Sequence, residues 1–235
     1  MNDSERTNPL EAYFHANPGH RINKWRHYFD IYHRHFERYR NEEIAVVEFG
    51  VAHGGSLQMW KEYFDPRSRI YGVDLDPGCK AVEEERIAIR IGDQEDRAFL
   101  RQLRDEIGEI DIVIDDGGHT MGQQITTFEE MFPGLVSGGT YLVEDVHTSY
   151  WDSHGGGYQR PGTFVEYAKH LIDQLHAWHS RDEPRLEVDR YTRQIRGIHI
   201  YDSVVVFDKA RVKRPRRTRT GQPAFERNPR RVEDG

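Results

Sequence analysis

The chain has 235 residues, of which 36% are hydrophobic and 31% are charged, and its net charge is −7. This length is typical of one domain, and the mean hydropathy of −0.84 argues against an integral membrane protein. No stretch approaches the ~20 apolar residues of a membrane-spanning helix, and the first residues lack the apolar run of a signal peptide. The single cysteine, Cys79, rules out an internal disulfide framework and a cysteine-rich zinc site. We therefore expect a cytoplasmic protein without a membrane partner.

The charge is divided unevenly along the chain. Residues 209–235 carry ten basic and three acidic side chains, or +7, which leaves −14 for residues 1–208. Three prolines and few apolar residues predict that the basic tail, residues 211–235, is disordered. Such a tail either binds nucleic acid or another anionic surface, or it folds back on the acidic body. We favour the second reading, because Phe225 is the only aromatic residue of the tail and an acidic body repels phosphate.

Residues 1–210 are expected to form one domain with an N-terminal helical extension over residues 1–42. Residues 1–20 are predicted to be irregular, with one short helical piece. Beyond them, large apolar residues recur at steps of three and four, which predicts a helix with one apolar face from Ile22 to Tyr39. The residues of this stripe are Ile22, Trp25, Phe29, Tyr32 and Phe36. We expect the stripe to pack on the core or on another subunit.

Short apolar strands then alternate with helices, which is typical of a parallel sheet with right-handed crossovers. The predicted strands are 44–49, 69–74, 86–91, 110–114, 140–143, 194–200 and 203–207. One predicted helix follows the turn at residues 53–56 and ends near residue 64. The other predicted helices span 95–106, 120–132 and 163–179. Only two residues separate the last two strands, so they must form an antiparallel hairpin. The pattern resembles the class I methyltransferase variant of the Rossmann architecture. We predict an α/β fold with a mostly parallel seven-stranded sheet, one antiparallel strand and helices on both faces.

Carboxylates follow five successive predicted strands, at the sheet edge where open α/β proteins bind ligands. These residues are Glu48, Asp74, Asp93, Asp115–Asp116 and Glu144–Asp145. The first strand leads into a glycine turn that lacks the spacing of a dinucleotide site. Its residues are Gly50, Gly54, Gly55 and Ser56. The negative charge of Glu48 would repel a pyrophosphate but would attract the sulfonium and ammonium groups of S-adenosylmethionine (SAM).

The same edge offers groups for the rest of this cofactor. Asp74 can accept both ribose hydroxyls. Asp93 and Gln94 can contact the adenine, although Asp93 could equally cap the next helix. We expect Asp115 to hold the amino group of the methionine part of SAM.

The acidic pairs after the fourth and fifth strands predict a metal site. If these strands are neighbours, Asp116, Glu144 and Asp145 meet, and three crowded carboxylates need a cation to neutralise them. A site made of oxygens selects a hard ion, so Mg2+ is the expected metal. The alternative is that one member of each pair faces solvent or caps a helix. His119 lies three residues after Asp116, where a histidine can act as general base, although a lone histidine at a helix start is more often a cap or a surface group.

Five motifs together resemble those of the metal-dependent sugar O-methyltransferases of macrolide and enediyne biosynthesis. The motifs are EFGVAHGGSLQMW, YGVDLDP, GDQ, IDDGGH and GGTYLVEDVHTSYW, and the resemblance runs from about Lys24 to Tyr158. A methylmannose-polysaccharide O-methyltransferase is similar in size and motif content. The resemblance implies that Asp116, Glu144 and Asp145 bind Mg2+ and that His119 is the catalytic base, with Gly118 where the family usually has serine. Members are commonly oligomers, so a homo-oligomer is expected.

The segment after the last acidic pair is the candidate acceptor site. Tyr150, Trp151 and Tyr158 flank a glycine-rich run, and aromatic faces suit the C–H faces of a sugar. His147 can orient a water or the sugar. Tyr150 and Trp151 could equally be core or interface residues.

The predicted function is therefore SAM-dependent and Mg2+-dependent methylation of a sugar hydroxyl. The alternatives are a catechol or phenolic acceptor, an enzyme resembling those that modify cephalosporins, and a non-catalytic protein that binds SAM or carbohydrate. A nucleic-acid partner is not expected.

Overall fold

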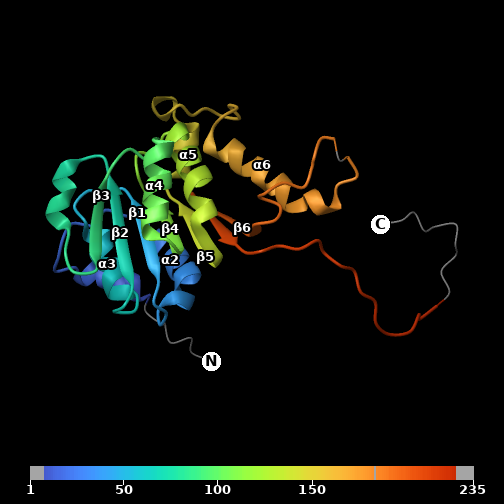
Figure 1. Cartoon of the computed structure of the whole chain (residues 1–235), viewed down its shortest axis with the longest axis horizontal. Coiled ribbons are helices and arrows are strands. Elements are labelled where there is room, and N and C mark those ends of the chain that lie inside the picture. The colour runs from blue at the N-terminus through green and yellow to red at the C-terminus, as the bar shows by residue number, and fades with distance from the viewer. Residues whose placement is uncertain (1–7, 183, 226–235) are drawn as a thin grey trace.

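The computed structural model describes residues 8–182 and 184–225, which form a seven-stranded sheet with helices on both faces (Figure 1). The strand order is β3-β2-β1-β4-β5-β7-β6, and β7 runs antiparallel to both of its neighbours. The predicted α/β architecture with one antiparallel strand is confirmed. The strands are β1 (Ala45–Phe49), β2 (Arg69–Asp74), β3 (Ile87–Ile91), β4 (Ile110–Asp115), β5 (Leu135–Val143), β6 (Ile195–Tyr201) and β7 (Val204–Lys209).

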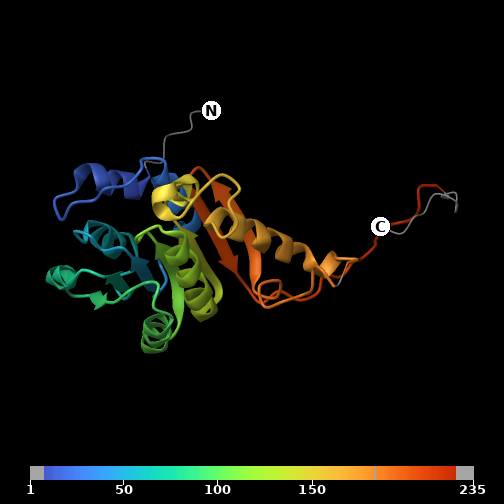
Figure 2. The ribbon, with the colours of Figure 1, turned by 90° about the horizontal axis from the view of Figure 1, so that it is seen from above.

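The helices divide between the two faces of the sheet, as the two buried clusters show (Figures 1 and 2). The first cluster unites one face with α1 (Pro9–Ala16), α2 (Tyr28–Phe36) and α3 (Gly55–Tyr63). The second unites the other face with α4 (Arg97–Ile107), α5 (Met121–Met131) and α6 (Phe164–His176). Short 3-10 helices lie at Glu37–Tyr39, Pro77–Val82, Phe132–Gly134, Val146–Tyr150, Asp152–His154 and Ala177–His179.

Alternation along the strands decides which side chains reach which face. In β1, Val46 belongs to the cluster under α1–α3, whereas Val47 belongs to the cluster under α4–α6. The same period of two directs Glu48, two residues after Val46, toward the α1–α3 face. It directs Asp115, two residues after Val113, toward the α4–α6 face.

The N-terminal segment differs from the prediction of a helix from Ile22 to Tyr39. Residues 21–27 have no helix, and α2 begins only at Tyr28. Trp25, expected to face inward, is 57% exposed. The reason is tertiary: the Lys24 side chain reaches down to buried carboxylates and draws this segment across the strand ends. Buried ion pairs here outweigh the apolar period that predicted the helix.

The basic tail is only partly described. Val212 N donates to the Arg193 carbonyl, and residues 213–225 contain no helix or strand. In both views this segment leads away from the sheet, so it does not fold back on the acidic body as we expected (Figures 1 and 2). Residues 226–235 of the predicted tail lie outside the described residues. Among the described residues, no helix is both long enough and apolar enough to cross a membrane.

Phe128 provides a test of the core under α4–α6, because it is fully buried and its ring contacts those of Phe132, Tyr141 and Phe207. We expect Phe128→Ala to lower the free energy of unfolding by about 3–5 kcal/mol, as measured by urea denaturation. The control Ile200→Ala removes a side chain that is 61% exposed and should cost less than about 1 kcal/mol. Equal costs for the two variants would contradict this description of the core.

Candidate functional site

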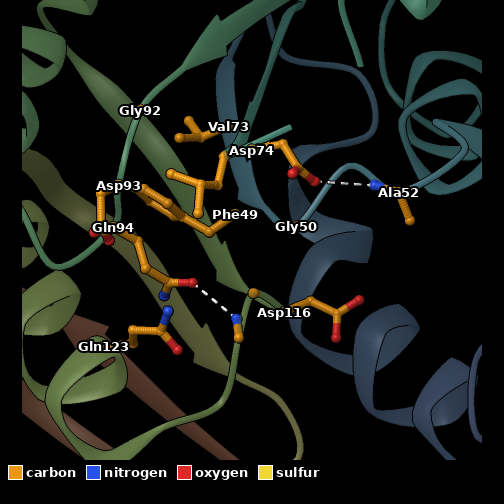
Figure 3. A pocket seen from close by; sticks show the side chains of 13 residues that line it. Phe49, Gly50, Ala52, Val73, Asp74, Gly92, Asp93, Gln94, Asp116 and Gln123 are labelled. Carbon is orange, nitrogen blue, oxygen red and sulfur yellow. Dashed lines mark hydrogen bonds between the residues drawn. The ribbon is translucent and has the colours of Figure 1, made fainter. Parts of the chain in front are cut away.

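A cleft opens at the carboxyl ends of β1, β2, β3 and β4 (Figure 3). Its walls include five of the residues that the sequence predicted to bind a cofactor or metal. These are Gly50, Asp74, Asp93, Gln94 and Asp116. Phe49, Ala52, Val73 and Gln123 complete much of the remaining wall. The predicted strand ends therefore do converge on one cavity.

Asp74 joins the end of β2 to the glycine turn. Its Oδ2 accepts hydrogen bonds from the backbone N–H groups of Ala52 (3.2 Å; Figure 3) and Val51 (2.8 Å), and its Oδ1 accepts from Asp76 N (2.9 Å). Burial alone would raise the pKa of Asp74, but these three N–H groups lower it below its usual value. The carboxylate facing the cleft is therefore charged at neutral pH.

The glycines of the turn serve close backbone contacts. Gly50 has φ +90°, and a Cβ there would lie 1.9 Å from the carbonyl oxygen of Asp116. Gly54 is also left-handed, with φ +75°, at the start of α3, and a Cβ on Gly55 would lie 2.4 Å from the Arg21 carbonyl oxygen. Gly50 thus lets the turn approach the loop after β4, Gly54 lies against Val82, and Gly55 lies against the backbone of residues 20–21.

Gln94 and Asp115 form a buried pair beside the cleft. Gln94 Nε2 donates to Asp115 Oδ1 (3.0 Å) and to Thr127 Oγ1 (3.1 Å), and its Oε1 accepts from Gly118 N (2.9 Å) (Figure 3). Asp115 is fully buried, and this burial raises its pKa to about 7. Asp115 holds Gln94 in the wall of the cleft, and its expected contact with the amino group of the cofactor stays a prediction.

A second buried cluster lies on the opposite face of the sheet, where Glu48, Asp116 and Glu144 surround the Lys24 ammonium. Lys24 Nζ donates to Asp116 Oδ2, and it lies 2.9 and 3.0 Å from the two carboxylate oxygens of Glu144. The Lys24 side chain is 3% exposed. The sequence analysis did not identify Lys24 as a site residue.

Glu48 lies beneath the cleft and does not line it. Its Oε2 accepts from Ser56 Oγ (2.7 Å). Its Oε1 has no hydrogen-bond partner among the described residues and lies 3.6 Å from Lys24 Nζ. Glu48 is fully buried, and the expected contacts of Glu48 and Ser56 with the cofactor stay predictions. Ser56 itself lines a neighbouring cavity with Lys24 and His119.

The charges of this cluster do not cancel. Burial alone would lower the pKa of Lys24, but the three carboxylates raise it well above its usual value, so the ammonium stays protonated. Burial raises the pKa of Glu144 and of Glu48, and Lys24 opposes both shifts. One ammonium thus faces three carboxylates in a nearly dry environment.

His119 lies between two acidic residues on the outer side of the cluster. Its Nε2 is 3.7 Å from Asp116 Oδ1 and 3.5 Å from Asp145 Oδ2. Burial lowers its pKa, although both carboxylates act to raise it. His119 and Asp145 both have left-handed backbones, with φ 55° and 51°, a strained conformation that often occurs at functional sites. Thr148 Oγ1 helps to hold the loop by donating to the His119 carbonyl (2.8 Å).

The predicted metal trio is therefore divided between two groups that share Asp116. Ligand atoms of Asp116, His119 and Asp145 lie within 4.8 Å of one another, and so do those of Glu48, Asp116 and Glu144. Asp116, Glu144 and Asp145 do line one cavity together, because β4 and β5 are neighbours as expected. Glu144, however, faces Lys24 and accepts a hydrogen bond from Tyr32 OH (2.7 Å).

Helix α2 contributes two tyrosines that the sequence analysis missed as site residues. Tyr28 OH donates to Asp145 Oδ1 (2.6 Å), as Tyr32 does to Glu144. A signal existed for Tyr32, because it belongs to the predicted apolar stripe and a buried tyrosine needs a partner for its hydroxyl; Tyr28 lies outside that stripe.

Aromatic side chains gather beside the cavity that Asp116, Glu144 and Asp145 line, and we call this group the aromatic rim. The ring of His147 contacts Trp151 (centroids 4.6 Å apart) and Trp25 (6.3 Å), and its Nδ1 contacts Ser203 Oγ. Tyr150 and Trp151 are 53% and 49% exposed, so the alternative that they belong to the core is wrong. Trp25 joins this rim because residues 21–27 do not form the predicted helix.

Comparison with known proteins identifies similar enzymes. Residues 47–146 match a family described as a methyltransferase domain. The 8-demethyl-8-(2-methoxy-alpha-L-rhamnosyl)-tetracenomycin-C 3'-O-methyltransferase of Streptomyces olivaceus is 36% identical over 198 residues, 80% of this chain and 50% of that protein. The mycinamicin VI 2''-O-methyltransferase of Micromonospora griseorubida is 38% identical over 190 residues, 77% of this chain and 47% of that protein. The chain spans about half the length of the curated relatives it matches.

Solved structures similar to this chain are also methyltransferases. MycE methyltransferase from the mycinamycin biosynthetic pathway, in complex with Mg and SAH, superposes with a TM-score of 0.78 at 35% identity, covering 88% of this chain and 56% of that chain. A putative caffeoyl-CoA O-methyltransferase from Staphylococcus aureus, with a TM-score of 0.50 at 13% identity, shares the fold. It covers 86% of this chain and 90% of that chain. The class I methyltransferase fold and the resemblance to sugar O-methyltransferases are confirmed.

Gly50 tests the close contact that shapes the cleft. We expect Gly50→Ala to lower the free energy of unfolding by more than about 2 kcal/mol, because backbone strain is joined by a clash with Asp116. Gly155→Ala is the matched control: its φ is +78°, but a Cβ there lies 3.8 Å from the nearest atom. This control should cost only about 1 kcal/mol in urea denaturation. If Gly50→Ala cost no more than the control, the described contact would be incorrect.

Proposed function

We propose that this chain, which has the class I methyltransferase fold and resembles sugar O-methyltransferases, transfers a methyl group from SAM to a sugar hydroxyl with the aid of Mg2+. The observation that carries the proposal is the meeting of Asp116, His119 and Asp145 beside the cleft that Asp74 lines. In the relatives, the named substrates are mycinamicin VI and a rhamnosyl tetracenomycin. The acceptor of this chain is proposed to be a sugar hydroxyl of a glycoside, an oligosaccharide or a sugar-bearing natural product.

The cleft is the proposed SAM site. Asp74 offers a charged carboxylate for the ribose hydroxyls, and Gly50 lets the backbone approach the ligand closely. Asp93 and Gln94 line the part of the cleft beyond Asp74, where they suit the adenine. The MycE complexes with SAH support this assignment, because the two folds superpose over most of this chain.

Asp116, Glu144 and Asp145 are the proposed Mg2+ ligands. Their fit rests on donor chemistry: they line one cavity with carboxylate oxygens, which hard divalent cations prefer. Lys24 neutralises only part of the negative charge there, so the cluster retains a demand for a further cation. His119, a poorer ligand for Mg2+ than a carboxylate, is left to act on the substrate.

The proposed mechanism assigns proton removal to His119. When bound, SAM supplies the methyl group and Mg2+ lowers the pKa of the acceptor hydroxyl. His119 Nε2 is the atom that takes the hydroxyl proton, because burial lowers the pKa of the imidazole and keeps it neutral at neutral pH. Asp116 and Asp145, on either side of Nε2, stabilise the imidazolium that results. The protein otherwise aligns the reactants and excludes water.

The aromatic rim is the proposed acceptor site. Trp25 and Trp151 are half exposed and both contact the ring of His147, and Trp25 lines the cavity together with Asp116 and Asp145. Flat aromatic faces pack against the C–H faces of a sugar ring, while His147 can donate or accept a hydrogen bond. Tyr150 is a further residue of this proposed rim.

We further propose that residues 1–210 form the catalytic domain, that the basic tail lies outside it, and that the protein acts as a cytoplasmic homo-oligomer. The exposed Ile200 supports self-association, since a large apolar side chain on a surface favours contact with a second copy.

The base assignment predicts that His119→Ala retains affinity for SAH and loses methyl transfer by at least about a hundredfold. Calorimetry with SAH measures the first quantity, and formation of SAH from SAM in the presence of an acceptor measures the second. His170→Ala, a histidine on α6 away from the cleft, is the control and should keep full activity. Normal turnover in His119→Ala would remove His119 from the mechanism.

The metal assignment predicts that EDTA abolishes methyl transfer and that excess Mg2+ restores it, because the acceptor hydroxyl is too weak an acid without a cation. The rate of SAH formation before EDTA, in EDTA and after Mg2+ is the measurement. Full activity in EDTA would rule out a required metal.

A further inference from the structure

Lys24 already occupies the cluster in which Mg2+ is proposed to bind. Its ammonium contacts Asp116 and both oxygens of Glu144, two of the three proposed metal ligands. A divalent cation that takes these oxygens must compete with the ammonium, since two cations that share the same carboxylate oxygens repel each other strongly in a dry site. Lys24 therefore cannot keep all of its present contacts when the metal is bound.

Glu48 offers the place to which the ammonium can withdraw. Glu48 Oε1 is fully buried, accepts no hydrogen bond from the described residues and lies 3.6 Å from Lys24 Nζ. A buried carboxylate oxygen that accepts no hydrogen bond leaves room for a donor to approach it, and the Lys24 ammonium is already within ion-pair distance. A small movement of the ammonium toward Oε1 would satisfy this oxygen and free Asp116 and Glu144.

The charges fit such an exchange. Without the metal, one ammonium serves three carboxylates; with the metal, Lys24 and Glu48 would form one neutral pair, and the two charges of Mg2+ would face Asp116, Glu144 and Asp145. The flexible four-carbon stem of lysine allows the movement without a change in the backbone.

We propose that Lys24 is a positioning residue that holds the metal ligands Asp116 and Glu144 until Mg2+ binds, and then moves to Glu48. The proposal rests on the proposed function only in taking Asp116 and Glu144 as the metal ligands. It assigns Glu48 to the docking of Lys24. It also ties the metal site to residues 21–27, which carry Trp25 on the rim of the cavity.

Calorimetric titration with Mg2+ alone, without SAM or acceptor, tests the competition. Lys24→Met should bind Mg2+ at least about tenfold more tightly than the unmodified protein, because the competing charge is gone. Its thermal midpoint without metal should be lower, and the rise caused by Mg2+ should be larger. Lys169→Met, which removes an exposed lysine paired with Glu166, is the control and should leave Mg2+ affinity unchanged. Unchanged or weaker Mg2+ binding by Lys24→Met would overturn the proposal.

A double-mutant cycle tests the withdrawal to Glu48. When Lys24 is present, Glu48→Gln should weaken Mg2+ binding about fivefold, because the ammonium then has no carboxylate to move to when it leaves Asp116 and Glu144. In the Lys24→Met background, the same substitution should weaken Mg2+ binding less than about twofold. Equal effects in both backgrounds would mean that Glu48 acts only through its charge, and would refute the exchange.

Two further outcomes are decisive. If Lys24→Met folds only in the presence of Mg2+, the metal has replaced the lysine and the proposal is supported. If it does not fold even then, unaltered Mg2+ affinity in Glu48→Gln contradicts the proposal and a fivefold loss supports it. Because the titrations need no acceptor, the expected shifts in a protein that methylates no sugar would reject the proposed function and leave the role of Lys24 intact.

Discussion

The buried ion cluster of Lys24 with Glu48, Asp116 and Glu144 is the constraint on which the rest of the site depends. Charges in a dry interior are tolerated only when they are paired and hydrogen-bonded. The lysine therefore draws residues 21–27 across the strand ends and delays the start of α2 to Tyr28. This non-helical segment in turn places Trp25 in the wall of the cavity, and α2 supplies tyrosine hydroxyls to Glu144 and Asp145.

Strand alternation divides the acidic residues at the sheet edge into two sets with different environments. Glu48 and Glu144 lie on the face of α1–α3, where Lys24 and Tyr32 meet them. Asp115 lies on the opposite face, where Gln94 holds it. Two carboxylates that are adjacent in the sequence therefore have different partners. Asp115 binds Gln94 in the wall of the cleft, whereas Asp116 contacts both Lys24 and His119.

The sequence was sufficient to predict the order of strands and helices, the antiparallel hairpin, and the meeting of Asp116, Glu144 and Asp145 at neighbouring strand ends. These features follow from local apolar patterns and from the rules of parallel sheets. The position of Lys24 could not be predicted in this way, because its partners are 24 to 120 residues distant in the chain. The sequence analysis treated each strand end as one location, so it did not foresee that Glu48 and Asp115 would lie on opposite faces of the sheet with different partners.

The central claim is that this site methylates a sugar hydroxyl. The most direct measurement is mass spectrometry of a panel of plain and partly methylated glycosides, with catechols beside them, after incubation with the protein, SAM and Mg2+. The account predicts the gain of one CH2 unit on a glycoside, located on the sugar by fragmentation. Methylation of catechols alone, or of no acceptor in a panel that covers mono- and oligosaccharides, would contradict it.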